Sequence, residues 1–173
     1  MNERSQPGTG VIQIVPFAPR RADGVAALIV GIQRDEFQIR ITLKDQPDLD
    51  NIPVFYQQGA GNFWVAIFDG EVVGTVALLD LGNHQAALRK MFVHAAWRGP
   101  GHGVSARLLE TLLEWCRSRA VKEVFLGTTE KFLAAHRFYE RNGFQQIPAT
   151  ELPPAFPKMA VDTRFYRLGT PFR

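Results

Sequence analysis

Two β-rich runs joined by a tight turn constrain the fold of this chain more than any other feature. The runs cover residues 64–68 and 71–78, and Asp69-Gly70 stands between them. Asp-Gly readily adopts the positive φ values of a two-residue hairpin turn, so the sequence predicts an antiparallel hairpin. A second turn at Gly82-Asn83 leads to a third strand at 87–93, which is expected to run antiparallel to its predecessor.

A helix is expected near the N-terminus, after a short strand at 11–15. Apolar residues there recur at the i, i+3, i+4 and i+7 spacing of one helix face, namely Val25, Leu28, Ile29 and Ile32. Asp23 stands just before this stripe and is the expected cap of the helix. Residues 44–62 then predict a long loop, which in a compact domain contains a short helix or shapes a binding site.

A longer helix is expected after Gly103, because leucines at helical spacing form one apolar face and charged residues occupy the other. Cys116 lies on the apolar face. We interpret it as a small buried apolar residue rather than as a reactive thiol.

The rest of the chain alternates strand and helix. A strand at 121–126 is followed by a helix that Thr128 or Thr129 can cap, and Gly143 is placed to end it in the left-handed conformation. A last strand is expected at 161–168. The order β, α, loop, three antiparallel strands, α, β, α, β, loop, β predicts an α/β fold of the α+β type, with a mixed, mainly antiparallel central sheet flanked by helices.

Length and composition narrow the class of protein. The 173 residues have room for one domain, which we place at 11–170 after a flexible lead-in at 1–10. Basic residues number 20 and acidic residues 17, giving a net charge of +3. Because the two signs are interspersed, nucleic acid is not an expected partner.

Compartment and metal content follow from what the sequence lacks. Its single cysteine cannot form an intrachain disulfide, no apolar run approaches the roughly 18 residues of a membrane span, and the first residues do not resemble a signal peptide. We therefore expect a cytoplasmic protein without membrane contact. The four histidines have no ligand spacing, so no metal is expected.

One short loop carries the chemistry, between the third predicted hairpin strand and the leucine-lined helix. It reads Arg98-Gly99-Pro100-Gly101-His102-Gly103. Its glycines let backbone N–H groups face a ligand, the helix N-terminus adds about half a positive charge, and the arginine adds a full one. These features suit a pyrophosphate, although the loop taken alone is equally typical of ordinary helix capping. It is neither a P-loop nor a Rossmann fingerprint.

Together with a second motif, this loop resembles the GNAT superfamily of N-acetyltransferases. The family's pyrophosphate loop, Gln/Arg-x-x-Gly-x-Gly/Ala, is matched by Arg98, Gly101 and Gly103. The family's closing signature, Ala-x-x-x-Tyr-x-x-x-Gly-Phe, is matched by Ala135, Tyr139, Gly143 and Phe144. The likeness extends from about residue 63 to residue 144.

The resemblance implies an acetyl-CoA-dependent N-acetyltransferase that needs no metal. In the family, the strand before the loop separates from its neighbour and binds the pantetheine arm, so Met91, Phe92 and Val93 join the loop residues 98–103 as the expected cofactor site. A free amide near Phe92 or Val93 would stabilise the oxyanion. Tyr139 would protonate the departing CoA thiolate.

Alternatives remain at both catalytic positions. Periodicity alone places Tyr139 on a helix face with Phe132 and Ala135, which is also typical of a core tyrosine. Many relatives carry a glutamate where this chain has Ala87, which cannot accept a proton. The base is therefore undetermined. Water, an acceptor amine of lower pKa, or a loop carboxylate would have to serve, and a non-catalytic acyl-CoA-binding or sensory module is the alternative function.

The acceptor is expected to be the amine of a small molecule or peptide. Its pocket would lie near Phe55 and Tyr56, the hairpin at Trp64, and Phe156, although these aromatic residues are equally suited to the core. Asp48 and its acidic neighbours in the loop could attract an amine or simply be solvated. The length of the acyl group does not follow from the sequence. Family members are often dimers, so a homodimer is compatible with the resemblance.

Overall fold

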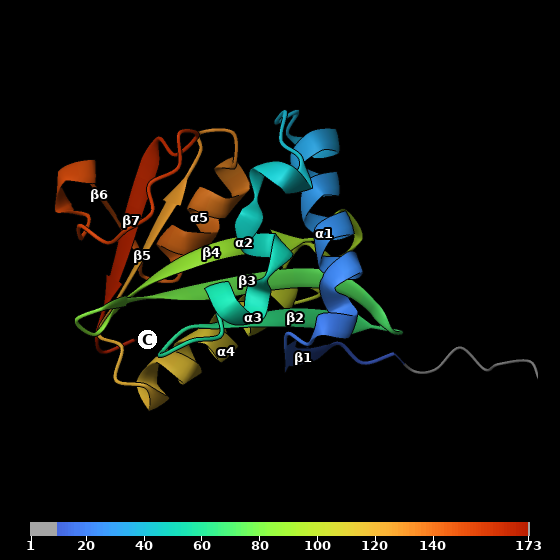
Figure 1. Ribbon diagram of the computed structural model, residues 1–173, viewed down its shortest axis with the longest axis horizontal. Coiled ribbons are helices and arrows are strands. Elements are labelled where there is room, and N and C mark those ends of the chain that lie inside the picture. Colours follow the sequence, from blue (N-terminus) through green and yellow to red (C-terminus); the bar gives the residue numbers. More distant parts are fainter. Residues whose placement is uncertain (1–9, 173) are drawn as a thin grey trace, which may run out of the picture.

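The computed structural model describes residues 10–172 and contains one seven-stranded sheet in the order β1-β2-β3-β4-β5-β7-β6 (Figure 1). The strands are β1 (Gln13–Pro16), β2 (Asn62–Phe68), β3 (Glu71–Gly82), β4 (Gln85–Val93), β5 (Glu123–Thr128), β6 (Gln145–Ile147) and β7 (Arg164–Gly169). Only β4 and β5 pair in parallel. The predicted mixed, mainly antiparallel sheet is confirmed, while the lead-in predicted at 1–10 lies outside the described residues except for Gly10.

Helices cover both faces of this sheet. They are α1 (Ala22–Gly31), the single-turn α2 (Pro47–Asp50) and α3 (Ile52–Phe55), α4 (Val104–Ser118) and α5 (Leu133–Arg141). A π-helical turn, Ile32–Glu36, continues α1. Four 3₁₀ turns lie at Pro19–Arg21, Leu43–Asp45, Ala95–Trp97 and Ala149–Glu151. In Figure 1, α1, α2 and α3 lie on one side of β2 to β4, and α4 lies on the other.

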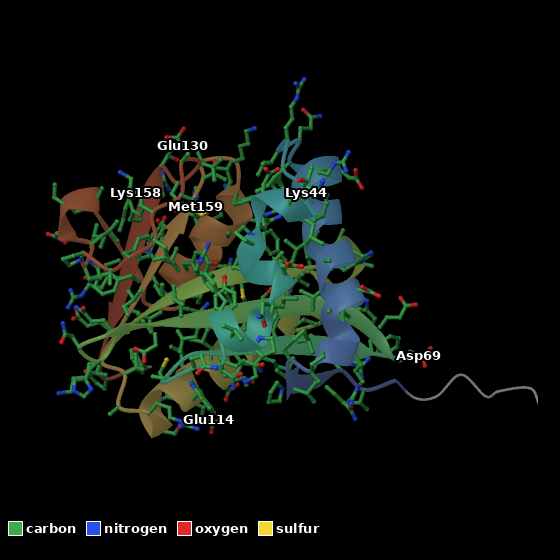
Figure 2. The ribbon with its side chains drawn as sticks, in the orientation of Figure 1. Lys44, Asp69, Glu114, Glu130, Lys158 and Met159 are labelled. Carbon is green, nitrogen blue, oxygen red and sulfur yellow. The ribbon has the colours of Figure 1, made fainter. Side chains whose placement is uncertain are left out.

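Alternation along β2 explains why the sheet has two cores. Phe63, Val65 and Ile67 pack with the α1 stripe, whereas Trp64 and Ala66 pack with the leucine face of α4. Successive side chains of a strand point to opposite faces, so an apolar strand of this length can serve both layers. Cys116 is fully buried in the α4 layer, as interpreted from the sequence. Charged side chains such as Asp69 and Glu114 lie at the periphery (Figure 2).

The helix starts differ from the prediction. Asp23 does not cap α1, because the helix follows directly on the 3₁₀ turn and Ala22 N–H bonds to the carbonyl of Pro19 in that turn. Neither Thr128 nor Thr129 caps α5. Thr128 ends β5, and a turn places Phe132 at the cap position instead.

A bulge in β4 separates it from β5. The parallel pairing of the two strands ends at Ala87 and Phe125. Shortly afterwards the register of β4 against β3 shifts, and Lys90 adopts the left-handed conformation with φ of 54°. Thr75 Oγ1 donates a hydrogen bond to the Lys90 carbonyl at 2.6 Å and holds the bulge. Bulges bend the strand that contains them, so the last residues of β4 lie beside an opening in the sheet.

Candidate active site

The opening between β4 and β5 leads into a cavity of about 920 Å³. Its walls come from the second half of β4, the end of β5, α5, the start of α4, the π-helical turn and a C-terminal segment at 156–162. Far-apart parts of the sequence therefore meet at the place where the sheet separates. A cavity of this volume at a break in the sheet is the default location for a ligand.

The glycine loop forms one end of the cavity. Gly103 is the N-cap residue of α4 with φ of 64°, and no side chain caps the helix there. The first N–H groups of a helix have no intrahelical partner, so they are donors for an anion. Trp97 supports the loop from outside, with its ring centroid 5.3 Å from that of His102 and 4.4 Å from that of Phe68.

Most residues of the expected cofactor site line this cavity. Those in the wall are Met91, Phe92, Val93, Arg98, Gly99, Pro100 and Gly103. Gly101 and His102 are not in the wall, because the loop turns them outward to exposed positions. Ser105 and Ala106, in the first turn of α4, are wall residues that the motif did not include.

Arg98 is held at the rim of the cavity by two contacts. Its Nε donates to the carbonyl oxygen of Val93 at 2.8 Å, which ties the loop to the end of β4. Its terminal nitrogens donate to both carboxylate oxygens of Glu36 at 2.6 and 2.8 Å. The arginine is therefore held beside the glycine loop. Its ion-pair partner, Glu36, was not among the residues expected from the sequence.

Tyr139, on α5, is also part of the cavity wall. Its ring packs 5.5 Å from that of Phe144 and 6.1 Å from that of Tyr166, so it belongs to the core and to the cavity at once. Its hydroxyl makes no hydrogen bond to any other described residue. Burial raises the pKa of Tyr139 above its ordinary value, so the phenol keeps its proton at neutral pH.

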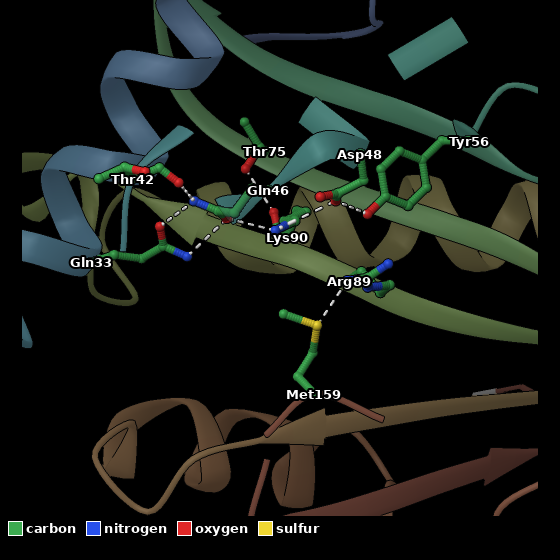
Figure 3. A network of polar contacts seen from close by, with 9 residues as sticks. All are labelled: Gln33, Thr42, Gln46, Asp48, Tyr56, Thr75, Arg89, Lys90 and Met159. Atoms are coloured by element: carbon green, nitrogen blue, oxygen red, sulfur yellow. Dashed lines mark hydrogen bonds and ion pairs between the residues drawn. The ribbon is translucent and has the colours of Figure 1, made fainter. Parts of the chain in front are cut away.

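A buried polar network closes the opposite wall (Figure 3). Lys90 Nζ lies 3.4 Å from Asp48 Oδ2, and each side chain is 7% exposed. The Tyr56 hydroxyl donates to the same carboxylate oxygen, and Gln46 Oε1 accepts from Lys90 at 2.7 Å. Desolvation lowers the pKa of Lys90 despite this partner. Asp48 is thus neither a solvated loop acid nor a carboxylate open to an acceptor amine.

The other candidates are placed as follows. Ala87 is fully buried and offers no proton acceptor. His136 is buried and bonded through Nε2 to the Thr129 carbonyl, while His94 is exposed. Within residues 10–172 no cluster of acids, histidines and cysteine suits a metal ion, and no helix is long and apolar enough to cross a membrane.

The aromatic residues expected around an acceptor are placed differently from one another. Phe156 lines the cavity, but Phe55 does not, and Tyr56 and Trp64 are core residues that are 0% and 3% exposed. Tyr56 and Trp64 pack into the cores on opposite faces of the sheet instead.

Charged residues take their place in the wall. Arg89, Lys90 and Asp162 line the cavity, together with Met159. Arg89 and Lys90 could have been noticed in the sequence, because they are two adjacent cations within an otherwise apolar strand.

Comparisons with known proteins agree with this geometry. The model of the acetyltransferase (GNAT) family matches residues 28–144. N-acetylaspartate synthetase of Xenopus tropicalis is 32% identical over 127 residues, which are 70% of this chain and 45% of that protein. The chain therefore spans less than half the length of this curated relative.

Solved structures extend the likeness to nearly the whole chain. An acetyltransferase of the GNAT family from Staphylococcus aureus Mu50 is 37% identical with a TM-score of 0.88, covering 92% of this chain and 99% of that one. N-acetylglutamate synthase from Neisseria gonorrhoeae, solved with coenzyme A and N-acetylglutamate, shares the fold at 18% identity and a TM-score of 0.67, covering 91% of this chain and 34% of that one. With a family model that matches more than half of its residues, the chain belongs to the acetyltransferase (GNAT) family.

Proposed function

We propose that this protein is an acetyl-CoA-dependent N-acetyltransferase that acts on a primary amine of a small molecule or peptide. The observation that carries the proposal is the single cavity that joins the glycine loop at the start of α4, the unpaired edge of β4 and the hydroxyl of Tyr139. The names of the relatives support the same class of reaction.

The chain's own groups fit the donor molecule. N–H groups at the start of α4 and the guanidinium of Arg98 would bind the diphosphate. Residues 91–93 would bind the pantetheine arm through backbone groups on the side where β5 no longer pairs. A thioester bound in this way would lie in the same cavity as Tyr139, which supports its role as the acid.

The proposed reaction needs one nucleophile and one acid. The neutral amine attacks the thioester carbon, so that a C–N bond forms, the C–S bond breaks and the thiolate leaves. A backbone N–H of β4 stabilises the intermediate oxyanion, an effect worth about 3 kcal/mol for one well-placed donor. Tyr139 gives its proton to the thiolate sulfur, and the proton lost by the amine nitrogen returns to the phenolate through water.

A non-catalytic acyl-CoA-binding module is the second candidate, and one observation favours it. Ala87 is fully buried where many relatives carry their glutamate, so β4 supplies no base at that point. Such a module would use the same cavity and bind the same donor.

One assay separates the two functions. The full chain is titrated with acetyl-CoA by calorimetry and then incubated with acetyl-CoA and a panel of amines, while thiol release is followed. Burial raises the pKa of Cys116 to about 12, so the protein's own thiol adds little background. Binding with amine-dependent thiol release supports the transferase, binding without it supports the module, and absence of binding overturns both.

A further inference from the structure

The side chain of Arg89 lines the cavity and forms few polar contacts there. Its Nη2 donates to Met159 Sδ at 3.5 Å, and it forms no ion pair with any carboxylate in the described part of the chain. A thioether sulfur is a weak acceptor for a group with five donors. The rings of Phe55 and Tyr56 hold the guanidinium at 5.8 and 5.9 Å from their centroids. Arg89 is therefore held in position without forming an ion pair.

The adjacent cation is in the opposite situation. Lys90 is neutralised by Asp48 and donates to Gln46, as Figure 3 shows. In the same view a dashed line joins Arg89, on β4, to the sulfur of Met159. Of these two neighbouring cations, Arg89 is therefore the one without an ion pair in the described part of the chain.

An acid faces the same space from the other side of the opening. Asp162 lines the cavity, and its Oδ2 accepts from Met159 N–H at 3.0 Å. The carboxylate lies against β5, since a Cβ added at Gly127 would come within 2.7 Å of the same oxygen. Asp162 forms no ion pair among residues 10–172. Met159 therefore brings the two groups together, with its sulfur on Arg89 and its N–H on Asp162.

We propose that the acceptor is a free amino acid, whose carboxylate binds Arg89 and whose ammonium group binds Asp162. This inference rests on the proposed function and names its substrate class. An amino acid carries one anion and one cation, and this part of the cavity wall offers an arginine on β4 and an aspartate against β5. The carboxylate pairs with the guanidinium fork through two parallel N–H···O bonds. The ammonium is left beside the opening where the thioester is expected.

The chemistry predicts a strong preference for the free carboxylate. A carboxamide of the same amino acid cannot neutralise Arg89, and a simple amine leaves the fork unfilled. Sites built around a polar contact discriminate strongly against ligands that lack it. We expect kcat/KM for a free amino acid to exceed that for its carboxamide at least about tenfold.

The experiment uses the full chain, acetyl-CoA, and a panel of free L-amino acids, each beside its carboxamide. In Arg89→Gln, the ratio of kcat/KM between the two members of each pair should fall to near one, mainly through KM. Arg89→Lys, which keeps the charge but not the fork, should give an intermediate ratio. Asp162→Asn should lower kcat/KM for both members and leave the ratio unchanged.

Lys158→Gln is the matched control. It removes the same charge one residue away from Met159 (Figure 2), and Lys158 is exposed and not part of the cavity wall. In this variant the ratio of kcat/KM between each free amino acid and its carboxamide should equal that of the wild type. CoA affinity measured by calorimetry reports whether each variant is folded.

Each outcome bears on one proposal. Acetyl transfer to amines with no preference for the carboxylate, or a preference that survives in Arg89→Gln, overturns the present inference and leaves the transferase intact. If no amine is acetylated, the proposed function fails, and calorimetry of the amino acids against the CoA complex decides the inference. Binding that is lost in Arg89→Gln supports it, and absence of binding overturns it.

Discussion

Glu36 holds Arg98 in a two-point ion pair, with the oxygens of the carboxylate 2.6 and 2.8 Å from the two terminal nitrogens of the guanidinium. The acid comes from the π-helical turn after α1, and the base from the glycine loop before α4. Both side chains are partly exposed, at 32% and 39%. The pair therefore joins two sides of the cavity mouth at the point where the diphosphate is expected.

Removal of this acid should strengthen cofactor binding. In Glu36→Gln the guanidinium is released from a competing anion, and a negative charge is removed from beside the phosphates. Exposed ion pairs are worth about 0–1 kcal/mol, so we expect CoA to bind about two- to fivefold more tightly. Calorimetry at two salt concentrations measures this, with Glu114→Gln on the outer face of α4 as control. Weaker binding in Glu36→Gln would show that the pair shapes the site instead.

Tyr139→Phe should separate catalysis from folding. The hydroxyl has no partner among the described residues, so its loss should hardly change the melting temperature. Turnover should fall by ~10²–10⁴ if the phenol is the acid, while CoA affinity is kept. Tyr166→Phe is the matched control, because this neighbouring hydroxyl donates to Glu140 at 3.0 Å and should affect stability more than turnover. Equal turnover in the two variants would remove Tyr139 from the role of acid.

Gly103→Val should weaken CoA binding by more than its effect on stability explains. A Cβ at this position touches nothing within 4 Å, but the backbone has φ of 64°. A side chain there costs about 1–2 kcal/mol of strain and enters the space of the diphosphate. Gly82→Val is the control, because it carries the same strain at φ of 76° at the end of β3, also in open space. If both variants bind CoA like the wild type, the phosphate site is elsewhere.

Asp162→Asn should change the pH dependence of stability. Burial raises the pKa of this carboxyl, against opposing contributions from the Met159 N–H bond and from Arg89, Lys158 and Lys90. An acid whose pKa is raised on folding stabilises the fold below its unfolded pKa and loses that contribution as pH rises through the folded pKa. The variant, which does not ionise, should therefore gain stability relative to the wild type as the pH rises above about 4, the ordinary pKa of an aspartate.

Melting temperatures across that pH range test this sign. Asp50→Asn, which removes an exposed carboxylate from α2, reports the effect of net charge alone. If the wild type instead becomes more stable relative to Asp162→Asn as the pH rises, the pKa of Asp162 is not raised in the folded state.

Local chemistry explains which parts of the fold were predictable. The Asp69-Gly70 hairpin, the leucine face of α4 and the left-handed Gly143 with φ of 90° depend on residues close in sequence, and all three are confirmed. Helix starts depend on the turn that precedes them. A 3₁₀ turn leads directly into α1, so Asp23 lies in the first turn of the helix rather than before it.

The candidate site divides in the same way. The two sequence motifs selected Arg98, Gly103 and Tyr139 before the fold was described, and all three line the same cavity. The partners of these residues could not be found from spacing, because Glu36 approaches Arg98 from 62 positions away and Met159 approaches Arg89 from 70. Asp48 is likewise buried against Lys90, which lies in the bulge of β4, and no periodicity in the sequence indicates that contact.

The segment 152–163 contributes Phe156, Met159 and Asp162 to the cavity, yet it contains neither helix nor strand, and β7 pairs with β5 only after it ends. Substitutions there alter the cavity wall without replacing any residue of a paired strand. Divergence confined to this one stretch would thus reshape that end of the cavity and leave the glycine loop untouched.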